Sequence, residues 1–313
     1  MTKVTNAVAT YDVTTNREDL ASAVYRISPS ETPFFSAIPK VKASAVLHEW
    51  SLDELDSTNT ANARLEGDAL SRAASTNPVR KSNYCQIMSR DCTVTGTQRA
   101  VNMAGIEDAL AYQKAKKGLA LRKDIESILL GNQGQNAGNT TTARKLRSMN
   151  AWIDANGSRG AEGADSTAAT AAATDATTLV TFTEVLLKDA IKDVYDDGGE
   201  PDLVLVGTAN KQIFSGFTGR SISQLMVGQG KIDGAANLYA SDFGDLKVVP
   251  NRTQRSRDVW VIDTSKVAVA GLRMFEPQEI ARVGDAYTSD LISELTLEVR
   301  APKAHGLVAD TNG

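Results

Sequence analysis

The sequence predicts an α+β protein in which helices and strands are interspersed, with no run of βαβ units. Residues 101–131 repeat apolar side chains at helical spacing, whereas residues 293–302 alternate apolar and polar side chains as a strand does. Residues 201–207, PDLVLVG, form a short apolar run that is typical of a buried strand. A hydrophobic share of 42% over 313 residues is enough for one large domain or two modest ones.

The N-terminal region reads as an arm. Residues 15–27 place apolar side chains on one helical face, and residues 28–40, SPSETPFFSAIPK, follow directly. Three prolines surround Phe34 and Phe35 there. Proline removes a backbone donor and biases the preceding residue away from helix, so we expect this segment to be extended.

The next region predicts a long two-stranded ribbon. Residues 46–50 alternate in a way that suits a strand poorly buried on either side, and residues 79–96 read as extended again. The intervening residues 56–78 are rich in Asn, Ser, Thr and Ala. Loops of this length are uncommon in compact domains and are usually functional or disordered.

Residues 101–131 predict the strongest helix of the chain, which would be roughly 40 Å long. Gly131 is a plausible C-terminal stop. Lys114, Lys116 and Lys117 lie in its middle, and we interpret them as a solvated helix face.

The second half of the chain alternates loops with regular elements. Residues 156–178 are rich in Ala, Thr and Gly and predict an exposed loop or linker. Residues 181–199 predict a helix with Thr181 and Glu184 in a capping box. Its buried stripe is predicted to be Leu187, Ala190, Ile191 and Val194. Residues 251–257, NRTQRSR, predict a solvated basic loop. The remaining apolar runs predict strands at 246–250, 258–263 and 266–275, and the alternation at 293–302 predicts a half-buried strand.

Motifs that would indicate an enzyme are missing. The sequence contains no P-loop, no G-x-S-x-G elbow and no H-E-x-x-H. Cys85 and Cys92 are too far apart for a metal-binding pair and are interpreted as packing residues. His48 is interpreted as a surface or contact residue, and His305 as a packing residue. We therefore predict a protein without catalytic residues, cofactor or metal.

Net charge, apolar runs and cysteine count argue against three further classes of protein. A net charge of −4 gives no support to a protein that binds nucleic acid over its whole surface. No apolar run approaches the length needed to span a membrane, and no basic region followed by an apolar run marks a secretory signal. Two cysteines make no disulfide framework, so a reducing cytoplasm is the expected place of synthesis.

Five segments carry a resemblance to a known family. They are residues 17–38, 144–153, 198–217, 242–252 and 297–308. In this order the chain resembles the major capsid proteins of tailed bacteriophages with the Hong Kong 97-type fold, in the branch typified by the coliphage SU-ten major head protein. The resemblance covers essentially the whole chain, and its first and third segments are the more specific.

The resemblance implies a division of the chain into five parts. Residues 1–40 correspond to an N-terminal arm, and residues 41–100 to the extended loop, a β-ribbon. Residues 101–175 correspond to a peripheral domain with a long spine helix, and residues 176–275 to an axial domain. Residues 276–313 return to the peripheral domain.

The function implied is that of a structural shell protein and not an enzyme. Chains would form hexamers and pentamers that build an icosahedral virion capsid around double-stranded DNA, contacted non-specifically. Scaffolding, portal and decoration proteins are the further partners implied, with assembly in the host bacterial cytoplasm and no membrane.

Seven residues are the candidate assembly contacts. The rings of Phe34 and Phe35 would bury against the protomer body or an adjacent subunit, and the alternative that they simply pack under their own domain is left open. Arg64, Glu66 and Arg72 on the ribbon tip are candidates for ion pairs between subunits. The full set is Pro33, Phe34, Phe35, Trp50, Arg64, Glu66 and Arg72.

Three other functions remain as alternatives. A cellular encapsulating shell of the same fold would contain a cargo enzyme. A hydrolase or transferase without a known motif would be a small oligomer with a substrate-sized pocket and activity that depends on His48 or His305. A tail or decoration component would form tubes or rings, or attach to existing shells.

Overall fold

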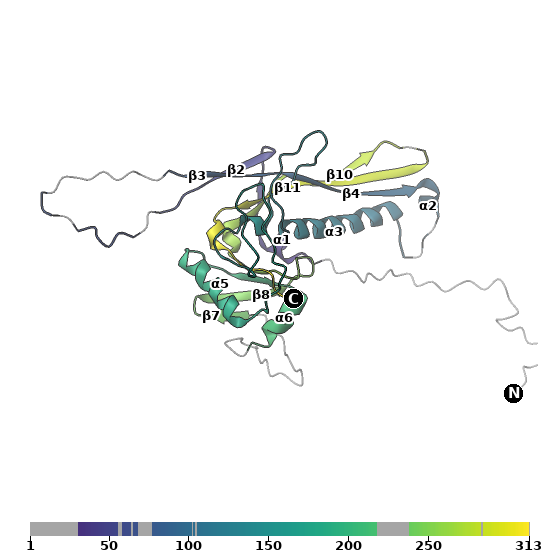
Figure 1. The fold of residues 1–313 in the computed structure, drawn as a ribbon. Helices are drawn as coiled ribbons and strands as arrows, with labels where there is room; N and C mark the ends of the chain where they lie inside the picture. Colours follow the sequence, from purple (N-terminus) through teal and green to yellow (C-terminus); the bar gives the residue numbers. More distant parts are fainter. Residues whose placement is uncertain are drawn as a thin grey trace, which may run out of the picture.

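The structure is a computed structural model of the chain, and its elements are shown in Figure 1. Two sheets and a ribbon organise the described residues, with a long helix along one sheet. The residues described are 31–55, 58–63, 65–67, 77–101, 103, 105–217, 238–282 and 284–312. The N-terminal helix expected at residues 15–27 lies outside them.

A four-stranded sheet forms the elongated part of the molecule (Figure 1). β1 pairs parallel with β10, and β10, β11 and β4 follow in antiparallel order. These strands are β1 (Lys40–Lys42), β10 (Val267–Ile280), β11 (Ala286–Val299) and β4 (Gln86–Thr95).

One face of this sheet is covered by α3 (Ala109–Leu129), the predicted spine helix. The Asp108 carboxylate caps it by accepting from the backbone N–H of Leu110 at 2.9 Å. The helix was expected to start at residue 101 but starts at Ala109. A separate short helix, α2 (Gly96–Ala100), ends before it with Val101 in extended backbone, and Gly105 adopts a φ of +72°. That backbone conformation interrupts a helix and is open mainly to glycine.

The predicted ribbon is present as β2 (Leu47–Leu52) paired antiparallel with β3 (Val79–Tyr84). The second extended segment does not continue as one strand, however. It divides at Cys85, after which β4 leaves the ribbon and joins the four-stranded sheet. Only tertiary pairing marks this division, because both halves have the composition of a strand.

The second sheet has six strands in the order β5-β12-β9-β6-β8-β7. α5 (Glu184–Asp196) packs against it through the predicted stripe Leu187, Ala190, Ile191 and Val194. Thr183, and not Thr181, caps this helix. The strands are β5 (Gly157–Ser158), β12 (Gly306–Val308), β9 (Val259–Ile262), β6 (Leu203–Val206), β8 (Gly244–Pro250) and β7 (Leu238–Ser241).

One large apolar cluster joins the two sheets. Trp260 of β9 and Leu297 of β11 both belong to it, together with side chains from α3. Residues Glu294 to Val299 of β11 are all buried, so this strand is covered on both faces and not half-buried as its alternation suggests. The short elements around the cluster are α1 (Pro33–Ala37), α4 (Met149–Trp152), α6 (Thr208–Ser215) and the 3₁₀ turns Thr264–Lys266 and Pro302–Ala304.

The Ala/Thr/Gly-rich segment at 156–178, predicted to be an exposed loop or linker, is a loop with many exposed residues, but it is anchored to the body at several points. It is irregular, but Ser166, Ala173 and Ala176 are buried, and Ala164 and Thr174 form an isolated bridge. Its small side chains allow close packing: a Cβ on Gly160 would approach the Cβ of Ala176 to 2.7 Å. The small side chains of this loop therefore allow close packing at the buried positions, while many of the other residues remain exposed.

Candidate assembly surfaces

The segment around the two phenylalanines is helical. Pro33 stands in the first turn of α1, where its missing N–H costs nothing, and Ile38 returns to extended backbone before Pro39. The expectation of an extended segment is therefore wrong over residues 33–37. Prolines bounded a short helix instead of excluding one.

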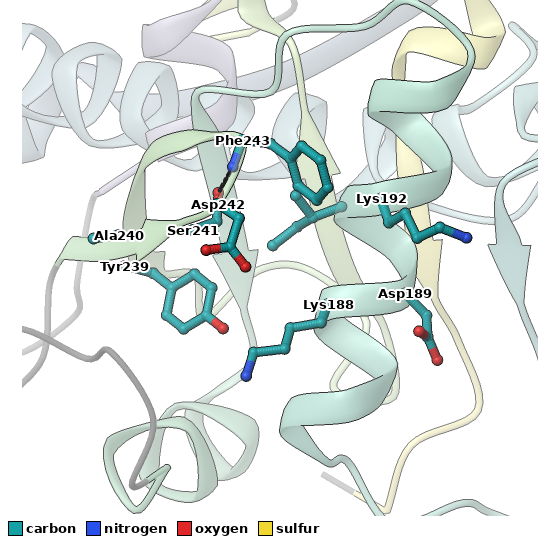
Figure 2. A pocket seen from close by; sticks show the side chains of 9 residues that line it. Lys188, Asp189, Lys192, Tyr239, Ala240, Ser241, Asp242 and Phe243 are labelled. Carbon is teal, nitrogen blue, oxygen red and sulfur yellow. Dashed lines mark hydrogen bonds between the residues drawn. The ribbon is translucent and has the colours of Figure 1, made fainter.

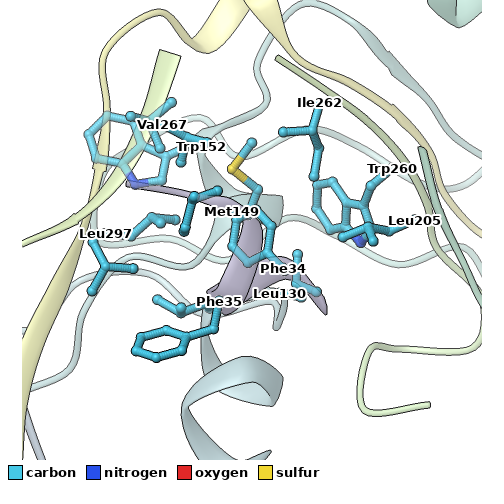
Figure 3. Close-up of a cluster of buried hydrophobic side chains, with 14 of the residues drawn as sticks. Phe34, Phe35, Leu130, Met149, Trp152, Leu205, Trp260, Ile262, Val267 and Leu297 are labelled. Carbon is cyan, nitrogen blue, oxygen red and sulfur yellow. The ribbon is translucent and has the colours of Figure 1, made fainter. Parts of the chain in front are cut away.

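Both phenylalanine rings are buried within the subunit itself. Figure 3 shows Phe34 and Phe35 among Met149, Trp152 and Leu297. Phe35 also meets Phe275 edge to face at 6.1 Å. Burial of each ring stabilises the fold by about 1.5–3 kcal/mol. Of the alternatives left open by the sequence, packing against their own subunit is the one present; their effect on assembly stays a prediction.

A buried carboxylate holds this helix in place. Glu126 of α3 accepts from the backbone N–H of Phe34 at 2.8 Å and from that of Phe35 at 2.7 Å. Asn251, directly after β8, donates to the same carboxylate at 2.7 Å. Burial raises the pKa of Glu126, while these three hydrogen bonds oppose that rise. The sequence gives no sign of this role, since Glu126 sits inside an apolar stripe.

The base of the ribbon is fixed to the body. The indole N–H of Trp50 donates to the carbonyl of Val299 at 2.9 Å, and its ring lies 5.5 Å from that of Trp152. His48 Nε2 lies 2.9 Å from Glu298 Oε2. The interpretation of His48 as a contact residue is confirmed, and its contact is with its own subunit.

The tip of the ribbon carries exposed apolar side chains. Leu55 is 100% exposed and Leu65 is 82% exposed, and Glu66 is exposed beside them. Arg64 and Arg72 lie outside the described residues. These side chains bury almost no apolar area within the subunit, so they are available for contact with another surface.

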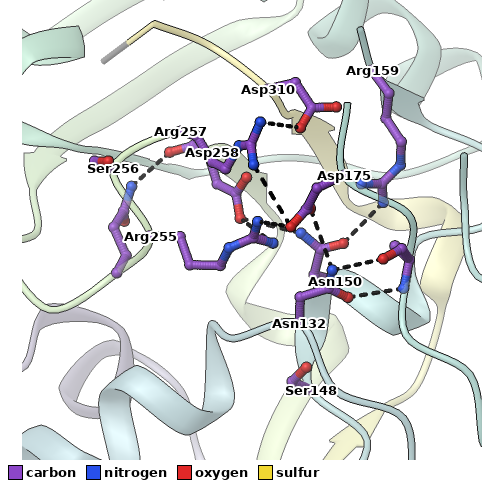
Figure 4. Close-up of polar contacts among 12 residues, drawn as sticks. Asn132, Ser148, Asn150, Arg159, Asp175, Arg255, Ser256, Arg257, Asp258 and Asp310 are labelled. Carbon is purple, nitrogen blue, oxygen red and sulfur yellow. Dashed lines mark hydrogen bonds and ion pairs between the residues drawn. The ribbon is translucent and has the colours of Figure 1, made fainter. Parts of the chain in front are cut away.

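A network of ion pairs lies where the irregular segment meets the C-terminus (Figure 4). Arg255 binds Asp175 at 2.5 Å, and Arg257 binds Asp310 at 3.1 Å. Burial raises the pKa of Asp258 to about 6, and Arg255 at 3.4 Å opposes that rise. The basic run 251–257 is thus not a solvated loop. Asp175 lies in the segment predicted to be an exposed loop or linker, and it supplies the negative charge that pairs with Arg255 and Arg257.

A cavity of about 400 Å³ lies between α5 and the turn from β7 to β8 (Figure 2). Lys188, Asp189 and Lys192 line it from the helix, whereas Tyr239 lines it from β7 and Phe243 from the turn. Neither histidine lines it. It brings together no nucleophile and base in an arrangement that would support catalysis.

The buried polar groups elsewhere act in packing. His305 is fully buried, and its Nδ1 accepts from the backbone N–H of Asp263 at 3.3 Å. Burial lowers the pKa of His305 to about 4, so the ring is neutral. Cys85 and Cys92 are buried free thiols, as predicted. Within the described part of the chain no cluster of three metal-ligating side chains occurs, and no helix is long and apolar enough to cross a membrane.

Comparison with known proteins identifies the fold. The cyanophage A-1(L) capsid asymmetric unit matches with a TM-score of 0.64, 12% identity and coverage of 99% of this chain and 100% of that chain. A chain from Microbacterium phage Oxtober96 matches with a TM-score of 0.62, 12% identity and coverage of 95% and 96%. The architecture is the Hong Kong 97-type capsid fold, as the sequence predicted.

Sequence comparison places the chain more narrowly. It is 24% identical over 340 residues to the major capsid protein of Escherichia phage Phieco32, covering 97% of this chain and 96% of that protein. Residues 4–312 match the model of one family. Its description agrees with the branch that the sequence resembles. The chain belongs to the SU10 major capsid protein family.

Proposed function

We propose that this structural protein of a phage head assembles as hexamers and pentamers into a closed icosahedral shell around double-stranded DNA. As a major capsid protein it is not an enzyme. Residues 176–275 would surround the axis of each capsomer, and residues 1–40 and 41–100 would join neighbouring subunits. Residues 101–175 and 276–313 would form the peripheral part between them.

The ribbon supplies the observation that carries this proposal. β2 and β3 lead out of the body (Figure 1). Leu55 and Leu65, which follow β2 in the chain, are 100% and 82% exposed. The base of the same ribbon is clamped by Trp50. A rigid base with an apolar end fits a contact that reaches a second copy of the chain, where each leucine would contribute about 1.5–3 kcal/mol if fully buried.

The test is negative-stain electron microscopy of the full chain expressed in bacteria, alone and with scaffolding genes. Leu55→Ser with Leu65→Ser should leave the melting temperature of the unassembled chain unchanged but reduce the yield of closed shells. Leu179→Ser, at a side chain 46% exposed on the body, is the matched control and should assemble. Full assembly of the double variant would contradict the role of the ribbon.

Partners beyond the shell itself are also part of the proposal. Scaffolding, portal and decoration proteins are expected to bind the assembling or finished shell. A cellular compartment of the same fold is disfavoured by membership of a phage capsid family. Enzyme cargo in purified particles, in place of DNA, would restore that alternative.

A further inference from the structure

The spine helix carries an excess of positive charge that has no partner in its own subunit. Its two acids are both engaged: Asp124 binds Arg90 at 2.6 Å, and Glu126 is buried under α1. Lys116, Lys117 and Lys123 form no ion pair with any described residue, whereas Lys114 pairs with Glu279. We call Lys116, Lys123 and the nearby Arg252 the basic strip.

Geometry aligns the members of the strip. Lys116 and Lys123 are seven residues apart on α3 and therefore point the same way, about two turns apart along the axis. Lys123 and Arg252 line one cleft of about 150 Å³ at the start of α1. Glu31 is the single acid lining that cleft, so the balance there remains positive.

The opposite face of the four-stranded sheet is acidic. Arg90 reaches α3, so Asp91, the next residue along β4, points to the other side. Asp290 of β11 lies directly across from Asp91, and Glu276 of β10 pairs with Ile292, two residues further along β11 on that same side. None of these three acids forms an ion pair with a described residue. The basic side chains on this face, Arg144 and Arg273, both bind Glu294.

The peripheral layer is thus polarised, with unpaired lysines on the helix side and unpaired acids on the sheet side. A closed shell filled with DNA presents one of these sides to a dense array of phosphates. Facing the acidic side inward would repel the genome, and facing the basic side inward would attract it. The overall charge of −4 does not distinguish the two orientations, whereas the distribution of charge does.

We infer that the α3 side of the peripheral layer faces the shell interior, and that Lys116, Lys123 and Arg252 bind the phosphates of the packaged double-stranded DNA without regard to sequence. This inference rests on the proposed shell function. A strip of three cations binds weakly in one subunit. Repetition over a shell makes the total contact substantial through multivalency.

The test measures binding of a mixed-sequence 30-base-pair duplex to the full, unassembled chain over a range of salt concentrations. The triple variant Lys116→Gln, Lys123→Gln, Arg252→Gln should flatten the plot of log affinity against log salt by up to about 2.7, since each lost phosphate contact removes about 0.9. The control Lys145→Gln, Lys247→Gln, Lys266→Gln removes the same charge from three exposed lysines elsewhere and should keep the wild-type slope.

Each single substitution is measured as well, with the thermal midpoint, so that a folding defect in the triple variant is recognised. Equal slopes for the strip and control variants would overturn the inference. Loss of shell assembly in the strip variant, with DNA binding unchanged, would also overturn the inference. That result would indicate that the basic strip contacts an acidic protein surface and not DNA. Failure of the wild-type chain to form shells under any condition would instead count against the proposed function, whatever the DNA measurement shows.

Discussion

The backbone N–H of Phe34 donates to Glu126 Oε1 at 2.8 Å, which joins the first described helix of the chain to the spine helix 92 residues later. The same carboxylate accepts from Phe35 and Asn251. Thr32, the residue that precedes α1, makes no capping hydrogen bond with its side chain. A remote carboxylate therefore performs the task that a local cap performs in most helices.

Replacement of Glu126 should destabilise the subunit strongly. Glu126→Ala leaves three buried donors unsatisfied, and we expect a loss of about 2–4 kcal/mol in the free energy of unfolding, measured with urea. Glu126→Gln retains one acceptor oxygen and should lose less. Asp124→Asn, two residues away on the same helix, breaks a partly exposed ion pair and should cost less than about 1 kcal/mol. Equal losses for Glu126→Ala and Asp124→Asn would contradict the capping role.

The double change Phe34→Ser and Phe35→Ser should reduce shell stability through the subunit itself. Emptying a buried Phe site costs about 3–5 kcal/mol, so two losses approach the whole stability of a typical domain. Calorimetry of the unassembled chain and of shells provides the measurement. Phe243→Ser, at an exposed ring, is the control. If mutant shells form and melt like the wild type, the arm has no role in stability. A normal subunit that fails to assemble would place the rings against a neighbour.

Trp50→Phe separates the hydrogen bond of the ribbon base from its packing. Phenylalanine keeps an aromatic ring near Trp152 but leaves the carbonyl of Val299 without the indole donor. We expect a loss of about 1 kcal/mol in the free energy of unfolding and faster proteolysis within residues 53–78. Trp50→Ala should lose more, because the packing is also removed. Unchanged proteolysis in both variants would show that Trp50 does not hold the ribbon.

Acid should destabilise the protein in part through His305. Its pKa of about 4 in the folded state lies below the usual 6.5, so the unfolded state binds the proton more readily between these values. The contribution of His305 to the free energy of unfolding is fully present above about pH 6.5. It is lost as the pH drops toward 4, which costs about 3 kcal/mol. His305→Asn cannot titrate, so its stability should fall less over that window. Parallel pH profiles for the two proteins would contradict the assignment.

Glu66→Ala should have little effect by itself. An exposed ion pair contributes about 0–1 kcal/mol, so shells of this variant should melt within a few degrees of the wild type. Leu65→Ser, one residue away, should lower the melting temperature of shells more. A larger effect from Glu66 than from Leu65 would show that charge, and not apolar burial, dominates the contact made by the ribbon tip.

The fold class and most elements could be predicted from local pattern. The stripe of α5, the buried run of β6 and the two ribbon strands appeared where periodicity placed them, because helical and extended spacing are properties of adjacent residues. The family followed from the residues at 17–38 and 198–217. Catalytic motifs such as the P-loop are also patterns of residues close together in the chain, so their absence could be read from the sequence.

What the sequence by itself determined about this protein is therefore its class, its family and the chemistry of its segments. Only the tertiary structure decided where those segments end and what they contact. β4 left the ribbon at Cys85 because pairing with β11 was available, and the helix at Pro33 formed because Glu126 was placed to accept its N–H groups. Such partners lie tens to hundreds of residues away, and no local pattern records a contact whose other half is so distant in the chain.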